Sequence, residues 1–226
     1  MNKMKIRPGL ERTGETGRSV VEVLTVLVIA GILTSVAIPQ LISARRLIRS
    51  AALPREIVSQ LRFARQQAMS QRQSFTVQYD DNNKQITNID HNNTNNANPA
   101  CNVNGTAIMT AANYPNTTCA STVATIPLAG VIVLPASELS FGIPSGVSVT
   151  ALSDSATPTS LTNGKLNITF QANGSVIDSV GNYNNRTLFL YNNRAAYETA
   201  AAISILGSSG RIKVWRLDRA TNKYVE

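Results

Sequence analysis

The longest run of apolar positions in the chain extends from Val20 to Ile38. One of its nineteen residues is charged, Glu22. Its other interruptions are Thr25, Gly31, Thr34 and Ser35. A helix of this length, rising about 1.5 Å per residue, crosses a bilayer. The run therefore separates a short charged segment, Met1 to Gly17, from a remainder long enough to fold as a domain.

An amphipathic helical pattern follows the apolar run, from Gln40 to about Ser70. Apolar residues recur at helical spacing and resume after Pro54. The two stripes are Leu41, Ala44, Ile48 and Ala51, then Ile57, Leu61, Ala64 and Ala68. The pattern predicts one long, interrupted helix over 40–74 whose second half covers a sheet. Most of its arginines are expected on a solvated face.

At Phe75 the period changes from helical to alternating. Phe75, Val77 and Tyr79 alternate with polar residues, which is typical of a half-buried strand. A turn at 81–83 leads to a weaker strand from Gln85 to Ile89. Further strands are expected at Val131–Leu134, Val147–Leu152, Lys165–Phe170, Ser175–Asp178, Thr187–Tyr191, Ala202–Leu206 and Arg211–Leu217.

Two turns connect these strands. Asn173-Gly174 predicts a type I′ hairpin turn, since both central residues of that turn need positive φ. Ser208 to Gly210 predicts another. The predicted fold class is α+β, with a long N-terminal helix packed on an antiparallel sheet over 75–226. No second domain boundary is visible.

An Asn- and Thr-rich segment at about 88–118 lacks periodicity and predicts a long surface loop. Cys101 and Cys119 lie in or next to it. In an oxidising compartment they can form a disulfide, which stabilises a fold by about 3 kcal/mol for a loop of this length. Free thiols or half of a metal site are the alternatives. His91 is the single histidine, which makes a metal site the weaker alternative.

Composition supports a folded domain, with 43% hydrophobic and 15% charged residues. The charge is uneven along the chain. Seven arginines and one glutamate give +6 over 40–75, two lysines and six acids give −4 over 76–185, and seven basic residues and three acids give +4 over 186–226. Such asymmetry suits a polyanionic partner or merely solubility, and composition does not decide between them.

The segment from Gly17 to Glu22, GRSVVE, followed by an apolar helix and Pro39, resembles the class III signal of type IV prepilins and type II secretion pseudopilins. The resemblance implies a leader peptide, 1–17, cleaved by a prepilin peptidase between Gly17 and Arg18. It also implies N-methylation at Arg18 and a transmembrane assembly helix over 18–39. The family usually has Phe at the first mature position, where this chain has Arg18.

Two roles follow from this resemblance. In the family, the carboxylate at the position of Glu22 is offset within the filament by the N-terminal amine of a neighbouring subunit. Pro39 matches a proline that permits a helix kink. A Sec signal cleaved after Ser35-Val36-Ala37 is one alternative, and a generic single-span anchor is another. Both leave Glu22 unexplained.

The C-terminal half is similar to the C-terminal domain of GspH/FimT-type minor pilins. The likeness rests on three segments, LNITFQANGS from Leu166, RTLFLYNNR from Arg186 and ISILGSSGRIKVWR from Ile203. It implies a periplasmic domain anchored in the inner membrane, with the leader on the cytoplasmic side, that passes into a pilus or pseudopilus. Other pilins or pseudopilins are the implied partners.

No catalytic motif is present, so an enzyme and a cofactor are not expected. The one candidate site is GRIKVWRLDR from Gly210. On a strand, Arg211, Lys213 and Trp215 share one face, suited to a nucleic-acid backbone with Trp215 stacking on a base. Arg216 and Arg219 would contribute from the strand end and tail, and Arg186 and Arg194 lie nearby if the strands pair in sequence order. The structural alternative is an exposed edge strand whose charges prevent aggregation, with Trp215 in a satellite core.

The resemblance therefore implies a FimT-like minor type IV pilin, incorporated into or priming a pilus. Some family members bind double-stranded DNA for natural transformation, and their motif matches Gly210, Arg211 and Lys213. The alternatives are a GspH-like minor pseudopilin of a type II secretion system and, in another class, a membrane-tethered DNA-binding module.

Overall fold

The computed structural model describes residues 19–91, 120–129, 134–147, 152, 158–178 and 181–226. The chain divides into two compact units, Met1–Ala44 and Arg45–Glu226. Gly17, Arg18, Cys101 and Cys119 fall outside the described residues. The cleavage site, the methylation site and the disulfide therefore stay predictions.

Helix α1 covers Val20–Gln71 and belongs to both units. The predicted interruption of the helix is wrong, because α1 continues through Pro39 and Pro54. A proline removes one hydrogen bond of the helix, and the bonds on either side hold the remaining turns. Near Pro39, the hydroxyl of Ser43 donates to the Pro39 carbonyl at 3.1 Å. The kink at Pro39 stays a prediction.

Within the second unit, one face of α1 is buried from Ser50 onward. The predicted stripe of Ile57, Leu61, Ala64 and Ala68 is confirmed, since each is 0% exposed. The predicted first stripe is not buried, and Ile48 remains 70% exposed. The helical spacing of apolar residues identifies a helix face that packs against other apolar residues. It does not show whether those residues belong to this chain or to another one.

The β-strands form two five-stranded sheets, where one sheet was expected. The first has the order β3-β2-β1-β5-β6 and the second β10-β9-β8-β7-β4, and all neighbours are antiparallel. Their bounds are β1 Phe75–Asp80, β2 Gln85–Asp90, β3 Ser121–Pro127, β4 Leu139–Phe141, β5 Lys165–Phe170, β6 Val176–Ile177, β7 Arg186–Asn192, β8 Ala201–Leu206, β9 Arg211–Asp218 and β10 Lys223–Val225. A 3-10 turn, η2 (Ala136–Glu138), and a short helix, α2 (Ala196–Thr199), complete the elements.

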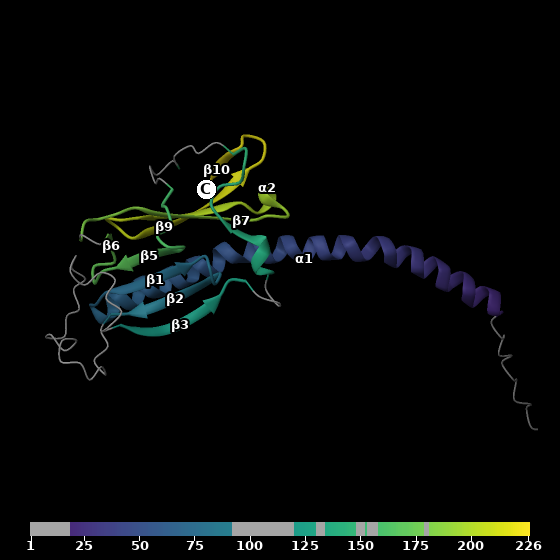
Figure 1. Cartoon of the computed structure of the whole chain (residues 1–226), viewed down its shortest axis with the longest axis horizontal. Coiled ribbons are helices and arrows are strands. Elements are labelled where there is room, and N and C mark those ends of the chain that lie inside the picture. Colours follow the sequence, from purple (N-terminus) through teal and green to yellow (C-terminus); the bar gives the residue numbers. More distant parts are fainter. Residues whose placement is uncertain (1–18, 92–119, 130–133, 148–151, 153–157, 179–180) are drawn as a thin grey trace, which may run out of the picture. The chain divides into compact units, whose positions relative to one another are not determined.

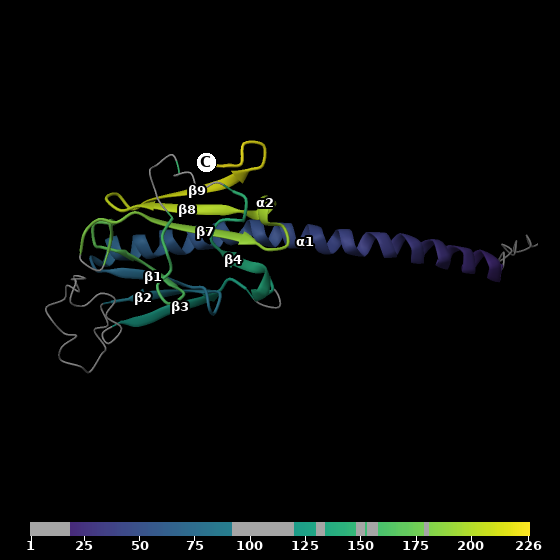
Figure 2. The same ribbon diagram turned by 45° about the horizontal axis from the view of Figure 1, so that its top comes forward.

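The two sheets share one core with α1. That core cluster takes Leu61 from α1, Tyr79 and Phe170 from the first sheet, and Leu188 and Ile203 from the second. In the views of Figure 1 and Figure 2, β3 lies on one side of this part of α1 and β9 on the other. Figure 2 shows β7, β8 and β9 side by side. The predicted α+β fold, a long helix packed on antiparallel strands, is confirmed.

Several strand predictions are confirmed closely and others are not. Strands β1, β2, β5, β6, β7, β8 and β9 match their predicted ranges within two residues. The prediction that β1 is half-buried is wrong, because both of its faces are buried. The predicted strands at 131–134 and 147–152 lie largely outside the described residues, and the part that is described contains no extended strand. Strands β3, β4 and β10 were not predicted. They are short or lie at or near an edge, and β3 has no alternation between buried and exposed residues.

The hairpin after β5 turns at the predicted place with different geometry. Gly174 has φ 78°, but Asn173 does not have positive φ, so the predicted type I′ turn is wrong. The Gly174 N–H donates to the Gln171 carbonyl at 2.8 Å, and the Gln171 N–H to the Ser175 carbonyl at 2.9 Å. One glycine with positive φ after a tight turn suffices in such a three-residue loop. The other predicted turn is confirmed at Gly210, whose φ is 62°.

Asp80 fixes the turn between β1 and β2. Its carboxylate accepts hydrogen bonds from the backbone N–H of Asn82 at 3.0 Å and from the side-chain amide of Asn83 at 2.8 Å. Burial alone would raise the pKa of Asp80, but these hydrogen bonds and the nearby charge of Lys165 lower it from its ordinary value. The carboxylate therefore stabilises the fold fully above its unfolded-state pKa of about 4 and loses that effect as the pH falls through the folded-state pKa.

Replacing Asp80 with Asn should lower the free energy of unfolding by about 1–2 kcal/mol near neutral pH, since charged acceptors form the stronger hydrogen bonds. Chemical denaturation near neutral pH and in acid measures the effect. The difference from the wild-type chain should shrink in acid. The exposed Glu56→Gln is the control and should change little. If the difference in the free energy of unfolding stays constant with pH, the ionisation of the Asp80 carboxylate does not contribute to stability.

Candidate functional site

The N-terminal part of α1 exposes apolar side chains around its circumference. Val20 is 75% exposed, Val26 61% and Leu33 65%. This is the one helix in the described part of the chain that is long and apolar enough to span a membrane, and none of that window is buried. Glu22 lies in its first turn, where the backbone N–H groups of Glu22 and Val23 donate to the Ser19 carbonyl. A carboxylate therefore stands at the start of the apolar stretch of α1, whose side chains are exposed.

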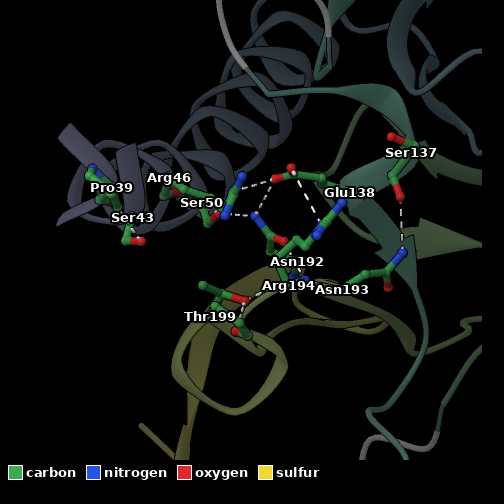
Figure 3. Close-up of polar contacts among 11 residues, drawn as sticks. Pro39, Ser43, Arg46, Ser50, Ser137, Glu138, Asn192, Asn193, Arg194 and Thr199 are labelled. Atoms are coloured by element: carbon green, nitrogen blue, oxygen red, sulfur yellow. Dashed lines mark hydrogen bonds and ion pairs between the residues drawn. The ribbon is translucent and has the colours of Figure 1, made fainter. Parts of the chain in front are cut away.

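A polar junction forms where α1 enters the domain (Figure 3). Arg46 Nε lies 2.8 Å from Glu138 Oε2. The Asn192 side-chain amide donates to Ser50 Oγ at 3.0 Å and to Glu138 Oε2 at 3.3 Å. Arg194 Nε lies 4.0 Å from Glu138 Oε1, and the Arg194 side chain is 69% exposed. The junction ties α1 to η2 and to the end of β7.

Sequence analysis missed this junction. Its members come from three separate segments, and none belongs to a motif. The one local signal is Glu138, an acid in a chain segment with few charges, which needs a partner when it is buried. Glu138 is 7% exposed and Ser50 is 4% exposed.

Replacing Glu138 with Ala should therefore destabilise the domain by about 2 kcal/mol, because Arg46 loses its partner and the Asn192 amide one acceptor. Thermal or chemical unfolding checks this value. Glu198→Ala removes an exposed acid that pairs with Arg219 at 3.1 Å, so this control should cost well under 1 kcal/mol. Equal losses for the two variants would contradict a structural role for the junction.

The candidate nucleic-acid strand, β9, exposes only part of the predicted patch. Arg211 and Arg216 are exposed, whereas Trp215 is 2% exposed. The Trp215 Nε1–H donates to Ser204 Oγ at 2.8 Å, and the ring packs with Phe189 and Ala202. The prediction that Trp215 stacks on a base is therefore wrong, because its ring fills a small core on the outer face of the second sheet.

The remaining basic residues of the patch are divided between two faces and two ends. Arg211 and Lys213 share a face, and Arg216 lies on the opposite one because side chains alternate along a strand. Arg219, beyond β9, pairs with Glu198. Strands β7, β8 and β9 do pair in sequence order, which places Arg186 at the Arg211 end. Arg194 follows β7 at the opposite end.

Arg65 of α1 connects the turns of the two sheets. Its Nη2 donates to the Ser209 carbonyl at 2.9 Å and its Nε to the Gly174 carbonyl at 3.3 Å. The Val176 N–H also donates to the Gly207 carbonyl, at 2.7 Å. A Cβ on Gly210 would lie 1.9 Å from the Gly174 carbonyl oxygen. The glycine of the Gly-Arg-x-Lys motif therefore allows two backbones to touch.

Comparison with known proteins gives a similarity of low degree to a solved structure. No family model matches the chain, and no curated protein matches it. The chain is similar to the crystal structure of the type IV minor pilin FimU of Pseudomonas aeruginosa PAO1, with 15% identity and a TM-score of 0.40. The match covers 77% of this chain and 91% of that chain.

Proposed function

We propose that the chain is a minor pilin-like subunit, held in the inner membrane by α1 and then incorporated into, or priming, a type IV pilus. The observation that carries the proposal is Glu22 in the first turn of α1, at the start of an apolar stretch that has no buried residue. A carboxylate in hydrocarbon is costly, and a plain membrane anchor gains nothing from it. A filament, by contrast, supplies a neighbouring N-terminal amine as its partner.

The extent of the exposed apolar surface supports the same proposal. Leu41, Ile42 and Ile48 are 53%, 52% and 70% exposed. At about 1.5 Å per residue, Ile48 lies about 40 Å along the helix from Val20, more than the hydrocarbon thickness of about 30 Å. Lipid alone does not cover the whole length of an upright helix of this kind. Neighbouring helices in a filament would cover the remainder.

The proposed maturation follows from the leader. A prepilin peptidase cuts between Gly17 and Arg18, and Arg18 becomes the methylated N-terminus. The domain then faces the periplasm. The mechanism is assembly and involves no catalysis by this chain.

Fractionation tests the proposed place of assembly. Filaments sheared from the cell surface should contain the chain, and they should lack it in a strain without the prepilin peptidase. A type II secretion pseudopilin would give a different result, since exoprotein secretion would then fail without the chain while the surface filaments would lack it. Presence of the chain in membranes alone, with both systems intact, would overturn both proposals.

DNA binding is a second candidate function, favoured by the exposed Arg211 on the same face of β9 as Lys213. Without a stacking tryptophan, the contact would go to phosphates and show little sequence preference. The double variant Arg211→Ala, Lys213→Ala should weaken binding to a short DNA duplex. It should also reduce the slope of log affinity against log salt concentration by the amount expected for the loss of about two phosphate contacts. Unchanged affinity would exclude this site. A merely membrane-tethered DNA-binding module would bind DNA and yet be absent from filaments.

A further inference from the structure

The ammonium group of Lys213 already has an anionic partner inside the chain. Its Nζ lies 2.5 Å from Glu226 Oε2. The same Nζ lies 4.9 Å from the centre of the Trp215 ring. The side chain of Lys213 is only 16% exposed, whereas that of Glu226 is 53% exposed. The lysine is thus covered by a carboxylate that itself faces solvent.

The pairing of β10 with β9 explains this contact. Val225 pairs with Arg216 and Tyr224 with Leu217. Continuing this antiparallel register by one residue brings Glu226 level with Trp215, on the face that carries Lys213. Glu226 therefore reaches Lys213 from the edge of the sheet.

The C-terminal hairpin is anchored independently of this ion pair. Asp218 accepts hydrogen bonds from the Thr221 hydroxyl at 2.7 Å and from the Ala220 N–H at 3.1 Å. The Tyr224 ring packs edge-on against Phe189, with their centroids 5.2 Å apart. Release of Lys213 thus requires only that the Glu226 side chain rotate away, while β10 stays in place.

We propose that Glu226 is an internal competitor for DNA at Lys213. This inference rests on the proposed DNA binding by β9. A carboxylate and a phosphodiester offer the ammonium group the same kind of anionic oxygen, and two anions held at one ammonium group repel each other. In the free protein Arg211 is exposed on this face, and Lys213 becomes available when a phosphate displaces Glu226. The competition weakens DNA binding, because a phosphate must displace Glu226 before it contacts Lys213.

The test compares the full chain in non-ionic detergent with Glu226→Gln, binding a fluorescent DNA duplex over a series of salt concentrations. Glu226→Gln should raise affinity by about two- to fivefold, the range of a partly exposed ion pair. In the Lys213→Ala background, Glu226→Gln should give no gain, because the competitor has lost its target.

Glu56→Gln is the matched control, since it removes one exposed carboxylate from α1, far along the sequence from β9. An equal gain for Glu56→Gln, or a gain that persists in the Lys213→Ala background, would show a general charge effect and overturn the competition. If the wild-type chain and Glu226→Gln bind DNA equally, only the competition fails. If neither binds, the proposed DNA binding fails with it.

Chemical modification tests the contact without DNA. Acylation of Lys213 by a neutral reagent, followed by mass spectrometry of the peptides, should be faster in Glu226→Gln than in the wild-type chain, because the amine is then uncovered. Lys165, whose side chain is 45% exposed, provides an internal reference. Equal rates at Lys213 in the two chains would overturn the proposal.

Discussion

Replacing Glu22 with Gln should remove the chain from filaments while leaving its insertion in the membrane intact. The variant keeps the size of the side chain and loses its charge. In the proposed filament this leaves the N-terminal amine of a neighbouring subunit without a partner in a medium of low dielectric constant. Loss of one partner of a buried ion pair costs about 3–5 kcal/mol, which lowers incorporation by about a hundredfold or more.

Quantitative immunoblots of sheared filaments and membranes measure this effect. Thr25→Ala is a control in the same helix, because Thr25 only donates to the Val21 carbonyl at 2.8 Å within its own turn. Glu22→Gln should accumulate in the membrane fraction at the wild-type level, and Thr25→Ala should enter filaments normally. Incorporation of Glu22→Gln at the wild-type level would remove the assembly role of this carboxylate.

Gly210→Ala should strongly destabilise the domain. Gly210 has φ 62°, which costs a side-chain-bearing residue about 1 kcal/mol. The new Cβ would also lie 1.9 Å from the Gly174 carbonyl oxygen and 2.8 Å from Arg65 Nε. The first of these is a backbone atom in the turn of the other sheet, so the two turns must separate. We expect a loss of about 4 kcal/mol or more.

Two further variants separate the causes of that loss. Gly142→Ala places a side chain at φ 115° with no atom within 4 Å, so it reports backbone strain without a clash. Arg65→Ala removes the hydrogen bonds to Ser209 and Gly174 and should cost about 1–2 kcal/mol. Thermal unfolding followed by circular dichroism ranks the three variants by their loss of stability. A Gly210→Ala melt close to wild type would show that the two turns do not touch in solution.

Periodicity predicted the elements that bury one face against the core of this chain. The stripe from Ile57 to Ala68 and the alternation of β1 identify α1 and its first partner strand, because each has one apolar face. The division into two sheets was not predictable in this way. Pairing is decided by contacts between distant strands, such as β1 with β5, and not by the pattern within either strand.

The candidate site shows the same limit. The sequence identifies Arg211 and Lys213 as cations on one face of a strand, and the structure confirms that placement. The burial of Trp215 depends on Phe189 and Ala202 of neighbouring strands, and the partner of Lys213 is Glu226, the residue after β10. Arg46, Glu138 and Asn192 meet only through tertiary contacts, so local pattern gives no signal for their junction.

The most direct test of the central proposal is the intact mass and N-terminal sequence of the protein isolated from membranes, with and without the prepilin peptidase. We expect a chain that begins at methylated Arg18, and one that still carries residues 1–17 when the peptidase is absent. A chain that begins at Ile38, or one that still carries Met1 in the presence of the peptidase, would contradict the pilin-like assignment.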